Sequence, residues 1–388
     1  MEKNLRSAIL FKKPYFLELL LFLFIINACE QENTPEINDL AQVGITYGGS
    51  QIDVGYFGQQ TKDGGFIITG LTRSYSISGS DIWLIKTDHN GEPEWDEIYG
   101  GVGEDYGLCV RELDNGGYII VGSALVKTQT QGSEDWINED ISGNAVQITS
   151  DGGFIVTGTM DNDISIIKTD SYGTQLWSKV FNIKNIDIGY SIEPTIDGGF
   201  IIAGCIDCES YSDLIIMKIN ELGDTLWTKT YGGYQDDMGA HSIQTSDLGY
   251  IVTGQTSSYG NGVNDLWLIK TDAYGDSLWT RLYGGSSLDE GSFVQQTSDN
   301  GYIITGINFS QVLPDYGDAW LVKTDSVGIK LWEKTFGGLG LDWGRTVQQT
   351  SDGGYALTGW REIVFNGEPD SQVWLILTDS EGEAYSGD

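Results

Sequence analysis

A ten-residue segment recurs along most of this 388-residue chain. Near copies of TKDGGFIITG, which spans 61–70, return at 149–158, 195–204, 245–254, 297–306 and 350–359, and LDNGGYIIVG at 113–122 is a weaker seventh. Between the aromatic residues that follow each turn, the steps are 52, 36, 46, 50, 52 and 53 residues: Phe66, Tyr118, Phe154, Phe200, Tyr250, Tyr302 and Tyr355. A period of this length predicts a β-propeller or a solenoid.

Each repeat reads as four short strands, which we name a to d. In the unit around 200–250, the runs FIIAG, LIIMKIN, TLWTKTY and HSIQT are separated by turn residues, and none has helical periodicity. The DGG segment is the turn between strands a and b, where glycine supplies positive φ and aspartate bonds its own backbone. The b–c and d–a connections are longer than the other two.

The two ends of the chain complement each other. The last unit stops after its strand c, VWLILTD, whereas VGITYGG at 43–49 matches the end of a strand d. Pairing of 43–49 with 373–378 would close a ring and leave few exposed sheet edges. The sequence therefore predicts an all-β fold: a seven-bladed β-propeller over 42–385, closed by its N-terminal strand.

Tryptophans of strands c and d are predicted to fill the spaces between blades. They are Trp83, Trp267, Trp320 and Trp374 in strand c, and Trp95, Trp177, Trp227, Trp279 and Trp332 in strand d.

The first residues predict export. Basic residues (Lys3, Arg6, Lys12 and Lys13) precede a mostly apolar run over 15–26, and Ala28-Cys29 comes before a polar stretch. The Ala-Cys ending resembles a bacterial lipobox, which implies a signal peptide over 1–28, lipidation of Cys29 and a tether over 29–41. We therefore expect an outer-membrane lipoprotein at the cell surface or facing the periplasm. The alternative is an ordinary secretory signal with a chance cysteine.

The net charge and the cysteines limit which partners and metal sites we expect. The formal net charge of −35 repels phosphate backbones, so we expect no nucleic-acid partner. Cys205 and Cys208 are able to form a local disulfide in an oxidising compartment, or to remain two thiols. A zinc site would need two further ligands, and neither histidine has matching spacing. We expect no metal and no cofactor, and a monomer that meets the membrane only through its lipid.

The pattern D-x-W-L-I-K-T-D, then L-W-x-K-x-Y-G-G, then T-S-D-G-G-Y-I-I-T-G resembles bacterial secreted β-propeller repeat proteins. NDLWLIKTDAYGDSLWTRLYGG at 264–285 carries most of it. Proteins of this family are mostly uncharacterised lipoproteins or adhesin-like surface proteins. The resemblance covers about 42–385 and implies the fold, but it transfers no catalytic residue. The D-x-x-G-x-x-L-W strand is more weakly similar to quinoprotein dehydrogenase and outer-membrane assembly propellers.

Most d–a connections carry an Asp-x-Gly motif. The aspartates are Asp53, Asp105, Asp187, Asp237, Asp289 and Asp342. In a closed propeller the d–a and b–c loops share one face, so these carboxylates are predicted to ring the channel mouth. They would then bind a cation or a polar ligand, or each would bond its own loop and shape the turn.

The b–c loops are the irregular part of the repeat. They carry aromatic residues among Ser, Gly and Asn, a mixture typical of recognition surfaces that include sugar stacking: Tyr75, Tyr211, Tyr259, Phe309, Tyr316 and Trp360. The alternative is that these rings pack on their own loops. Arg73 and Arg361 would pair with local carboxylates or hold an acidic ligand group. These connections are shortest in the second and third units, so we expect a cleft there and ligand contacts on the taller loops.

Two functions follow from these patterns. The first is a non-catalytic binding or scaffold module for a glycan or protein partner on the long-loop face. The alternative is a carbohydrate-active hydrolase or lyase that uses acidic residues at the channel mouth. No serine elbow or Cys/His pair supports nucleophilic catalysis.

The lipobox gives a first testable prediction. Changing Cys29→Ser should release the protein from the membrane fraction, because the lipid is the anchor that we identify. Fractionation with an acyl label measures this. A variant that still sediments with membranes, together with an unlabelled wild type, would contradict the prediction.

Overall fold

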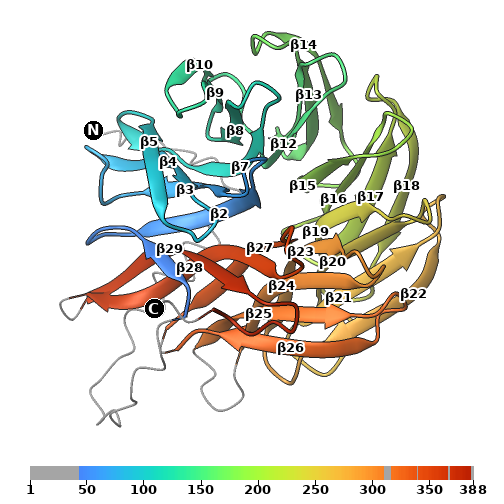
Figure 1. The fold of residues 1–388 in the computed structure, drawn as a ribbon. Coiled ribbons are helices and arrows are strands. Elements are labelled where there is room, and N and C mark those ends of the chain that lie inside the picture. Colours follow the sequence, from blue (N-terminus) through green and yellow to red (C-terminus); the bar gives the residue numbers. More distant parts are fainter. Residues whose placement is uncertain (1–42, 310–315, 339, 366–367, 386–388) are drawn as a thin grey trace, which may run out of the picture. The chain divides into compact units, whose positions relative to one another are not determined.

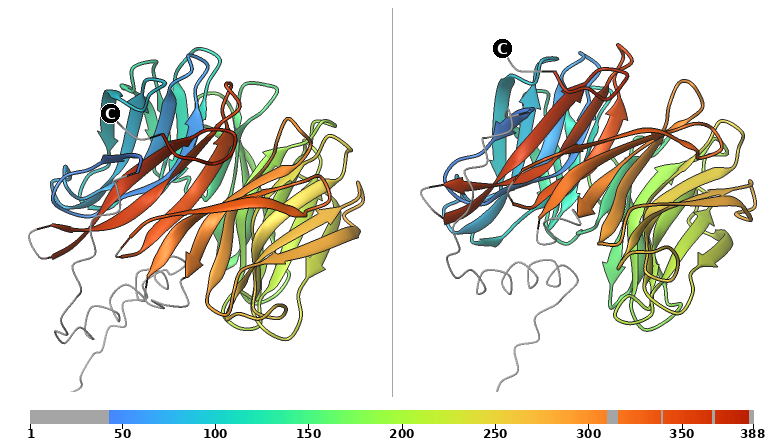
Figure 2. Two further views of the ribbon diagram at one scale, coloured as in Figure 1. Left: turned by 60° about the horizontal axis from the view of Figure 1, so that its bottom comes forward. Right: turned by 90° about the horizontal axis from the view of Figure 1, so that it is seen from below.

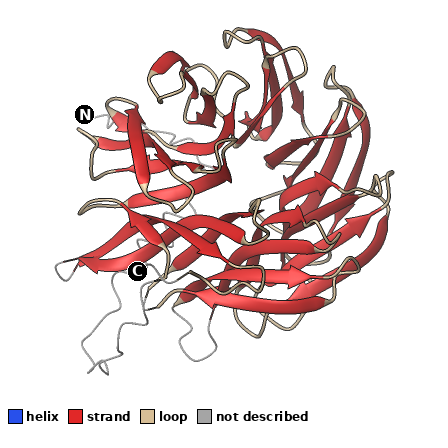
Figure 3. Ribbon diagram, viewed as in Figure 1, coloured by secondary structure: helices blue, strands red, loops and turns tan. Residues whose placement is uncertain are grey.

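The structure is a computed structural model that describes residues 43–385, apart from 310–315, 339 and 366–367. Over these residues the regular structure consists of strands, with no α-helix (Figure 3). The same residues contain no helix that is long and apolar enough for a membrane span. The predicted signal peptide, the tether and Cys29 lie outside the described residues.

The strands form seven sheets, here called blades 1 to 7 in the order of their first strands (Figure 1). Blade 1 contains β2 (Asp53–Gln60), β3 (Phe66–Thr72), β4 (Gly79–Thr87) and β5 (Pro93–Tyr99), and β6 (Gly103–Glu104) pairs with β4; blade 2 contains β7 (Gly107–Glu112), β8 (Tyr118–Gly122), β9 (Leu125–Thr128) and β10 (Glu134–Asn138); blade 3 contains β11 (Ala145–Ile148), β12 (Phe154–Met160), β13 (Asp163–Thr169) and β14 (Gln175–Phe181); blade 4 contains β15 (Asp187–Pro194), β16 (Phe200–Ile206), β17 (Asp213–Ile219) and β18 (Thr225–Tyr231).

The remaining three blades repeat the same order. Blade 5 contains β19 (Asp237–Gln244), β20 (Tyr250–Thr256), β21 (Asp265–Thr271) and β22 (Ser277–Tyr283); blade 6 contains β23 (Asp289–Gln296), β24 (Tyr302–Phe309), β25 (Gly317–Thr324) and β26 (Lys330–Phe336); blade 7 contains β27 (Asp342–Gln349), β28 (Tyr355–Phe365), β29 (Glu368–Thr378) and β1 (Ile45–Tyr47).

The N-terminal strand closes the ring as predicted. β1 runs antiparallel to β29, with Ile45 opposite Leu375 and Tyr47 opposite Val373. The Trp374 indole also donates to the carbonyl of Val43 at 2.8 Å. Both views of Figure 2 show the blue N-terminal strands beside the red C-terminal ones. The prediction of a seven-bladed β-propeller is confirmed.

The first strand of each blade packs against the first strands of the neighbouring blades. Contacts run from β2 to β7, β11, β15, β19, β23, β27 and back to β2. These seven strands are therefore the innermost layer of the propeller, and the last strand of each sheet lies at its outer edge. This arrangement puts side chains from different blades close together at the centre of the ring.

Aromatic rings fill the junctions between blades. Trp227 of β18 packs edge-on against Tyr250 of the next blade, with 5.4 Å between ring centroids. Trp332 and Tyr355 repeat this contact at 5.7 Å. The strand-c tryptophans are almost fully buried, as Trp374 at 1% exposure illustrates. Burying such large rings contributes strongly to inter-blade stability.

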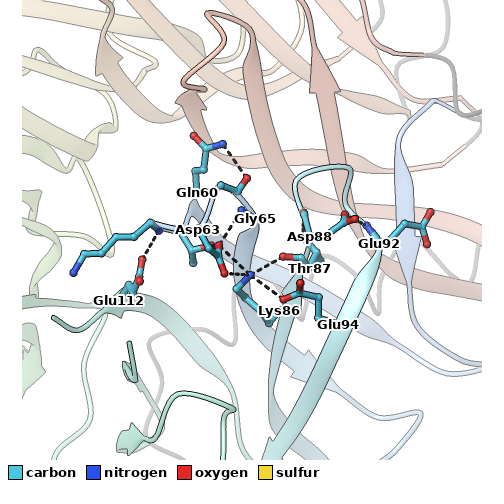
Figure 4. A network of polar contacts seen from close by, with 12 residues as sticks. Gln60, Asp63, Gly65, Lys86, Thr87, Asp88, Glu92, Glu94 and Glu112 are labelled. Atoms are coloured by element: carbon cyan, nitrogen blue, oxygen red, sulfur yellow. Dashed lines mark hydrogen bonds and ion pairs between the residues drawn. The ribbon is translucent and has the colours of Figure 1, made fainter. Parts of the chain in front are cut away.

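A buried lysine fixes the a–b turn on the opposite face from the d–a loops. In blade 1, Lys86 Nζ lies 2.9 Å from the Asp63 carboxylate and also donates to the carbonyl of Thr87 (Figure 4). Burial alone would raise the pKa of Asp63, but bonds from Thr61, Lys86 and Gly65 outweigh it and lower this pKa to about 2. The repeated Asp and Lys are thus parts of the scaffold. The same pairing occurs at Lys168–Asp151, Lys218–Asp197, Lys270–Asp247 and Lys323–Asp299.

This turn yields a stability prediction. Leu248 holds the turn position at φ +68°, where Gly198 has φ +82°, and about half of the leucine is exposed. Changing Leu248→Gly should therefore stabilise the protein by about 1 kcal/mol, since positive φ is strained for residues with a Cβ. Urea unfolding measures the effect.

The matched control is Gly198→Ala, where an added Cβ would meet no atom within 4 Å. It should destabilise the protein through backbone strain alone. Equal stability of both variants and the wild type would contradict this account of the turn.

Candidate functional site

The Asp-x-Gly aspartates tie two loops together. Asp53 accepts the backbone N–H of Gly49 at 2.8 Å and the hydroxyl of Ser74 at 2.6 Å on one oxygen, and the hydroxyl of Thr72 at 2.5 Å on the other. Gly49 lies in a d–a loop, whereas Thr72 ends β3 and Ser74 lies in the b–c loop that follows. These bonds fit the second of the two sequence interpretations, in which the aspartate shapes its own loops.

Most of the other aspartates are equally buried. Asp105 is half-buried, whereas the remaining five side chains are fully buried: Asp53, Asp187, Asp237, Asp289 and Asp342. Among the described residues, no group of three or more His, Cys, Asp or Glu side chains is arranged to hold a metal ion. Direct binding of a ligand by these carboxylates stays a prediction, and their burial gives them a positioning role.

A second carboxylate approaches four of these six aspartates. At the junction of blades 6 and 7, a Cβ on Gly337 would lie 2.2 Å from an oxygen of Asp318 and 2.5 Å from one of Asp342. The first glycine of the Y/F-G-G segment is therefore required by the carboxylates on either side. Similar pairs recur around Gly100, Gly232 and Gly284, so no blade-specific catalytic pair emerges here.

The predicted loop aromatics occupy different environments. Tyr75 and Tyr259 pack against the tryptophans of their own blades, Trp83 and Trp267, and each remains about half exposed. The Tyr259 hydroxyl also donates to the carbonyl of Gly232 at 2.8 Å. These rings thus combine packing on the loop with an exposed edge.

Within the part of the chain that the structure describes, Tyr211 and Tyr316 make no ring contact of the kind that Tyr75 and Tyr259 make with a tryptophan, and they differ in exposure. Tyr211 is 72% exposed and has φ +56°, and Tyr316 is half-buried just before β25. Cys205, which lies in β16 of the same blade as Tyr211, forms a disulfide with Cys208 that constrains the start of this b–c loop.

Trp360 departs from the sequence expectation. It lies within β28, opposite Val373, and only 8% of it is exposed. The segment expected to be an irregular loop instead continues the pairing of β28 and β29, each of which is 11 residues long. Trp360 therefore belongs to a sheet and not to the loop rim. The two arginines expected in these loops pair with local carboxylates: Arg73 with Glu104 at 3.0 Å, and Arg361, which lies in β28, with Asp342 at 3.9 Å.

A set of five residues that the sequence analysis missed lies on the innermost strands. Arg111 of β7 contacts the Glu193 carboxylate of β15 at 2.6 Å, and His241 of β19 lies 3.3 Å from the same oxygen. The His241 ring stacks on Phe293 of β23 at 3.7 Å. Phe293 packs edge-on against Phe57 of β2, and the guanidinium of Arg111 covers Phe57 at 4.5 Å. The contacts form a closed circuit.

The positive charge of Arg111 and the His241 ring stabilise the ionised form of Glu193. Burial would raise the pKa of Glu193, but Arg111 and His241 outweigh burial and hold it below its usual range. The Arg111 and Glu193 side chains are only 14% and 17% exposed, so removing either one would leave the other charge poorly solvated and without its partner. The sequence carried a signal for this pair. Arg111 and Glu193 stand four positions after the strand-a glycine, where four of the other five blades carry glutamine and blade 5 carries Ile243.

One further position on the innermost strands changes from blade to blade. It follows the glycine of strand a and is half-buried in all seven blades: Tyr56, Leu108, Asn144, Tyr190, Ala240, Ser292 and Arg345. The Arg345 guanidinium lies 5.5 Å from the Tyr56 ring and 5.1 Å from the Trp343 ring. Among the described residues Arg345 forms no ion pair, in contrast to Arg73 and Arg361.

Comparison with protein-family models and with curated proteins finds no match. Among solved structures, the chain is similar to Sqt1 from Chaetomium thermophilum, with 10% identity, 82% of each chain covered and a TM-score of 0.52. It is also similar to the Pan2 WD40 domain of Neurospora crassa, with 11% identity, 88% of this chain and 92% of that chain covered, and a TM-score of 0.50.

A protein of unknown function from Bacteroides caccae matches 66% of this chain and 90% of its own, with 14% identity and a TM-score of 0.44. At these identities the comparisons show the fold alone. Membership of the bacterial secreted repeat family stays a prediction.

The Asp342 carboxyl gives a pH prediction. Burial raises its pKa to about 7, with Asp318 adding to the shift and Arg361 opposing it. Because this folded-state pKa lies above the unfolded value, its contribution to stability is complete below about pH 4 and is lost as pH rises toward about 7. Urea unfolding between about pH 5 and 7 should show this decline, and Asp342→Asn should reduce it.

The control is Asp114→Asn, which changes a fully exposed carboxylate on another loop. It should leave the pH dependence as in the wild type. An unchanged slope in Asp342→Asn would contradict the assigned protonation.

Proposed function

We propose that this chain is an exported, lipid-anchored β-propeller that acts as a non-catalytic binding or scaffold module for a glycan or protein partner. The observation that carries the proposal is the variable inner-strand position after the strand-a glycine. It is half-buried in every blade, yet it holds six residue types in seven blades. A position that keeps its exposure while changing its chemistry is suited to recognising one specific ligand.

The glycines beside this position explain why it is so constant in space. A Cβ on Gly344 would lie 2.2 Å from the Thr305 hydroxyl of the preceding blade, and a Cβ on Gly291 would lie 2.3 Å from that of Thr253. In these blades strand a is therefore closely packed against the preceding blade at its glycine. The residue after the glycine is delivered to an equivalent place in each blade, where only its side chain differs.

Arg345 is the most distinctive member of this set. Two aromatic rings flank its guanidinium, and the Trp343 indole is itself fixed by a 2.9 Å bond to the Ser292 hydroxyl. A guanidinium held by rings keeps its five donors in a defined plane for acceptors on a ligand. We place the ligand over this inner position and the adjoining loops that carry Tyr75, Tyr211 and Tyr259.

An enzyme is the second candidate, and one observation bears on it. The pKa of Asp342, at about 7, is in the range useful for a general acid. However, the carboxylate is fully buried and accepts backbone bonds from Gly338 and Glu362, which tie the d–a loop to β28. We therefore favour the structural role and the binding module.

The test uses the full-length protein purified in detergent. A glycan array and a pull-down from envelope extract would identify a ligand, and a polysaccharide-degradation screen would run beside them. Arg345→Ala and Tyr259→Ala should each weaken binding by roughly 1–3 kcal/mol if they contact the ligand. The control is Tyr274→Ala, an exposed ring on a c–d turn.

The outcomes separate the candidates. Loss of affinity at Arg345 or Tyr259, with Tyr274→Ala unchanged, supports the proposed face. Unchanged affinity in both, with the fold intact, would overturn it. Polysaccharide cleavage that is lost in Asp342→Asn would replace the binding module by the enzyme.

A further inference from the structure

The junction between blades 2 and 3 is built differently from the others. At other junctions an aromatic residue at the end of the outer strand packs toward the next blade, and where that strand carries a tryptophan the aromatic lies four positions after it. Its hydroxyl, where present, donates to a turn carbonyl of that blade: Tyr47 reaches Gly91 and Tyr283 reaches Gly328, both at 2.6 Å. Tyr99 and Tyr231 make the same bond to Gly132 and Gly275.

Blade 2 lacks this aromatic residue because its chain is shorter here. From Trp136 to the strand-a glycine Gly143 is seven residues, whereas the equivalent intervals Trp95–Gly107 and Trp177–Gly189 are each twelve. The outer strand β10 accordingly ends at Asn138, and the exposed Asp140 takes the sequence position of the aromatic.

The junction is nevertheless held together. Asn138 Nδ2 donates to the carbonyl of Gly173 at 2.9 Å, and Gly173 is the same turn glycine that accepts a tyrosine hydroxyl at other junctions. A Cβ on Gly173 would lie 2.6 Å from the Trp136 ring, so the turn packs directly on the indole. The inter-blade bond is thus kept while the bulk of the aromatic ring is removed.

The result is an open groove of about 650 Å³. Its floor and walls come from 136–141 of blade 2 and 172–175 of blade 3. This volume is within the range of small-ligand sites. Tyr172 lines this groove and is 78% exposed.

We propose that this groove binds a neutral saccharide, as a second site separate from the loop face. The Tyr172 ring offers a flat apolar surface for the carbon face of a sugar ring. Glu139, Asp140 and Gln175 supply acceptors, and the amide of Gln175 supplies donors, for the hydroxyls around such a ring. No lysine or arginine lines the groove among the described residues, and two carboxylates do, so an anionic ligand is disfavoured.

The probes are maltohexaose, cellohexaose, xylohexaose and mannohexaose, titrated separately into the full-length protein in detergent and followed by calorimetry. At least one should bind with a Kd below about 10 mM. Tyr172→Ala should then weaken that binding by about tenfold or more, and Tyr172→Phe should retain it, because the ring provides the contact.

The matched control is Tyr274→Ala. Tyr274 occupies the same turn position in blade 5 and is 71% exposed, but the adjacent junction there is closed by Tyr231. Binding should be unchanged in this variant. Failure of all four sugars to bind, or equal losses in Tyr172→Ala and Tyr274→Ala, would overturn the proposal. Loss in Arg345→Ala with none in Tyr172→Ala would also overturn it, while leaving the proposed loop-face function in place.

Discussion

The pairing of β1 with β29 is the contact on which the whole ring depends. It joins residues 45–47 to a strand more than 300 positions away and provides blade 7 with its outer strand. Tyr47 then reaches across to blade 1 through its bond to Gly91. Without this strand, β29 would be an open edge and the junction of blades 7 and 1 would lose an aromatic contact. An unpaired edge of this kind favours association with other chains.

Repetition in this chain is largely a solution to internal packing. The aspartate of most strands a holds two loops, the lysine of most strands c holds the a–b turn, and the tryptophans of strand d fill the junctions. Residues with these tasks have little capacity left for a ligand. Functional chemistry is therefore expected where the repeat varies, at the inner-strand position of Arg345 and at the shortened junction of blades 2 and 3.

The two proposed sites arise in different ways. The inner-strand position varies by substitution on an unchanged backbone, whereas the groove arises by deletion of a strand end. The deletion is tolerated because Asn138 replaces the tyrosine hydroxyl as the donor to the next turn. The circuit of Arg111, Glu193 and His241 adds a third kind of variation, in which charges unique to single blades bond one another across the centre of the ring.

The sequence by itself determined the blade count, the strand order and the closure, because these follow from periodic apolar runs, turn residues and complementary ends. It also marked the aspartates and the tryptophans as recurring elements. Only the tertiary structure decided that Trp360 lies within a sheet, that five of the six aspartates are buried, and that Glu193 meets both Arg111 and His241. Such contacts join residues 48 and 82 positions apart. Periodicity reports which face of a strand is buried, but contacts across the ring depend on how seven sheets pack around one centre.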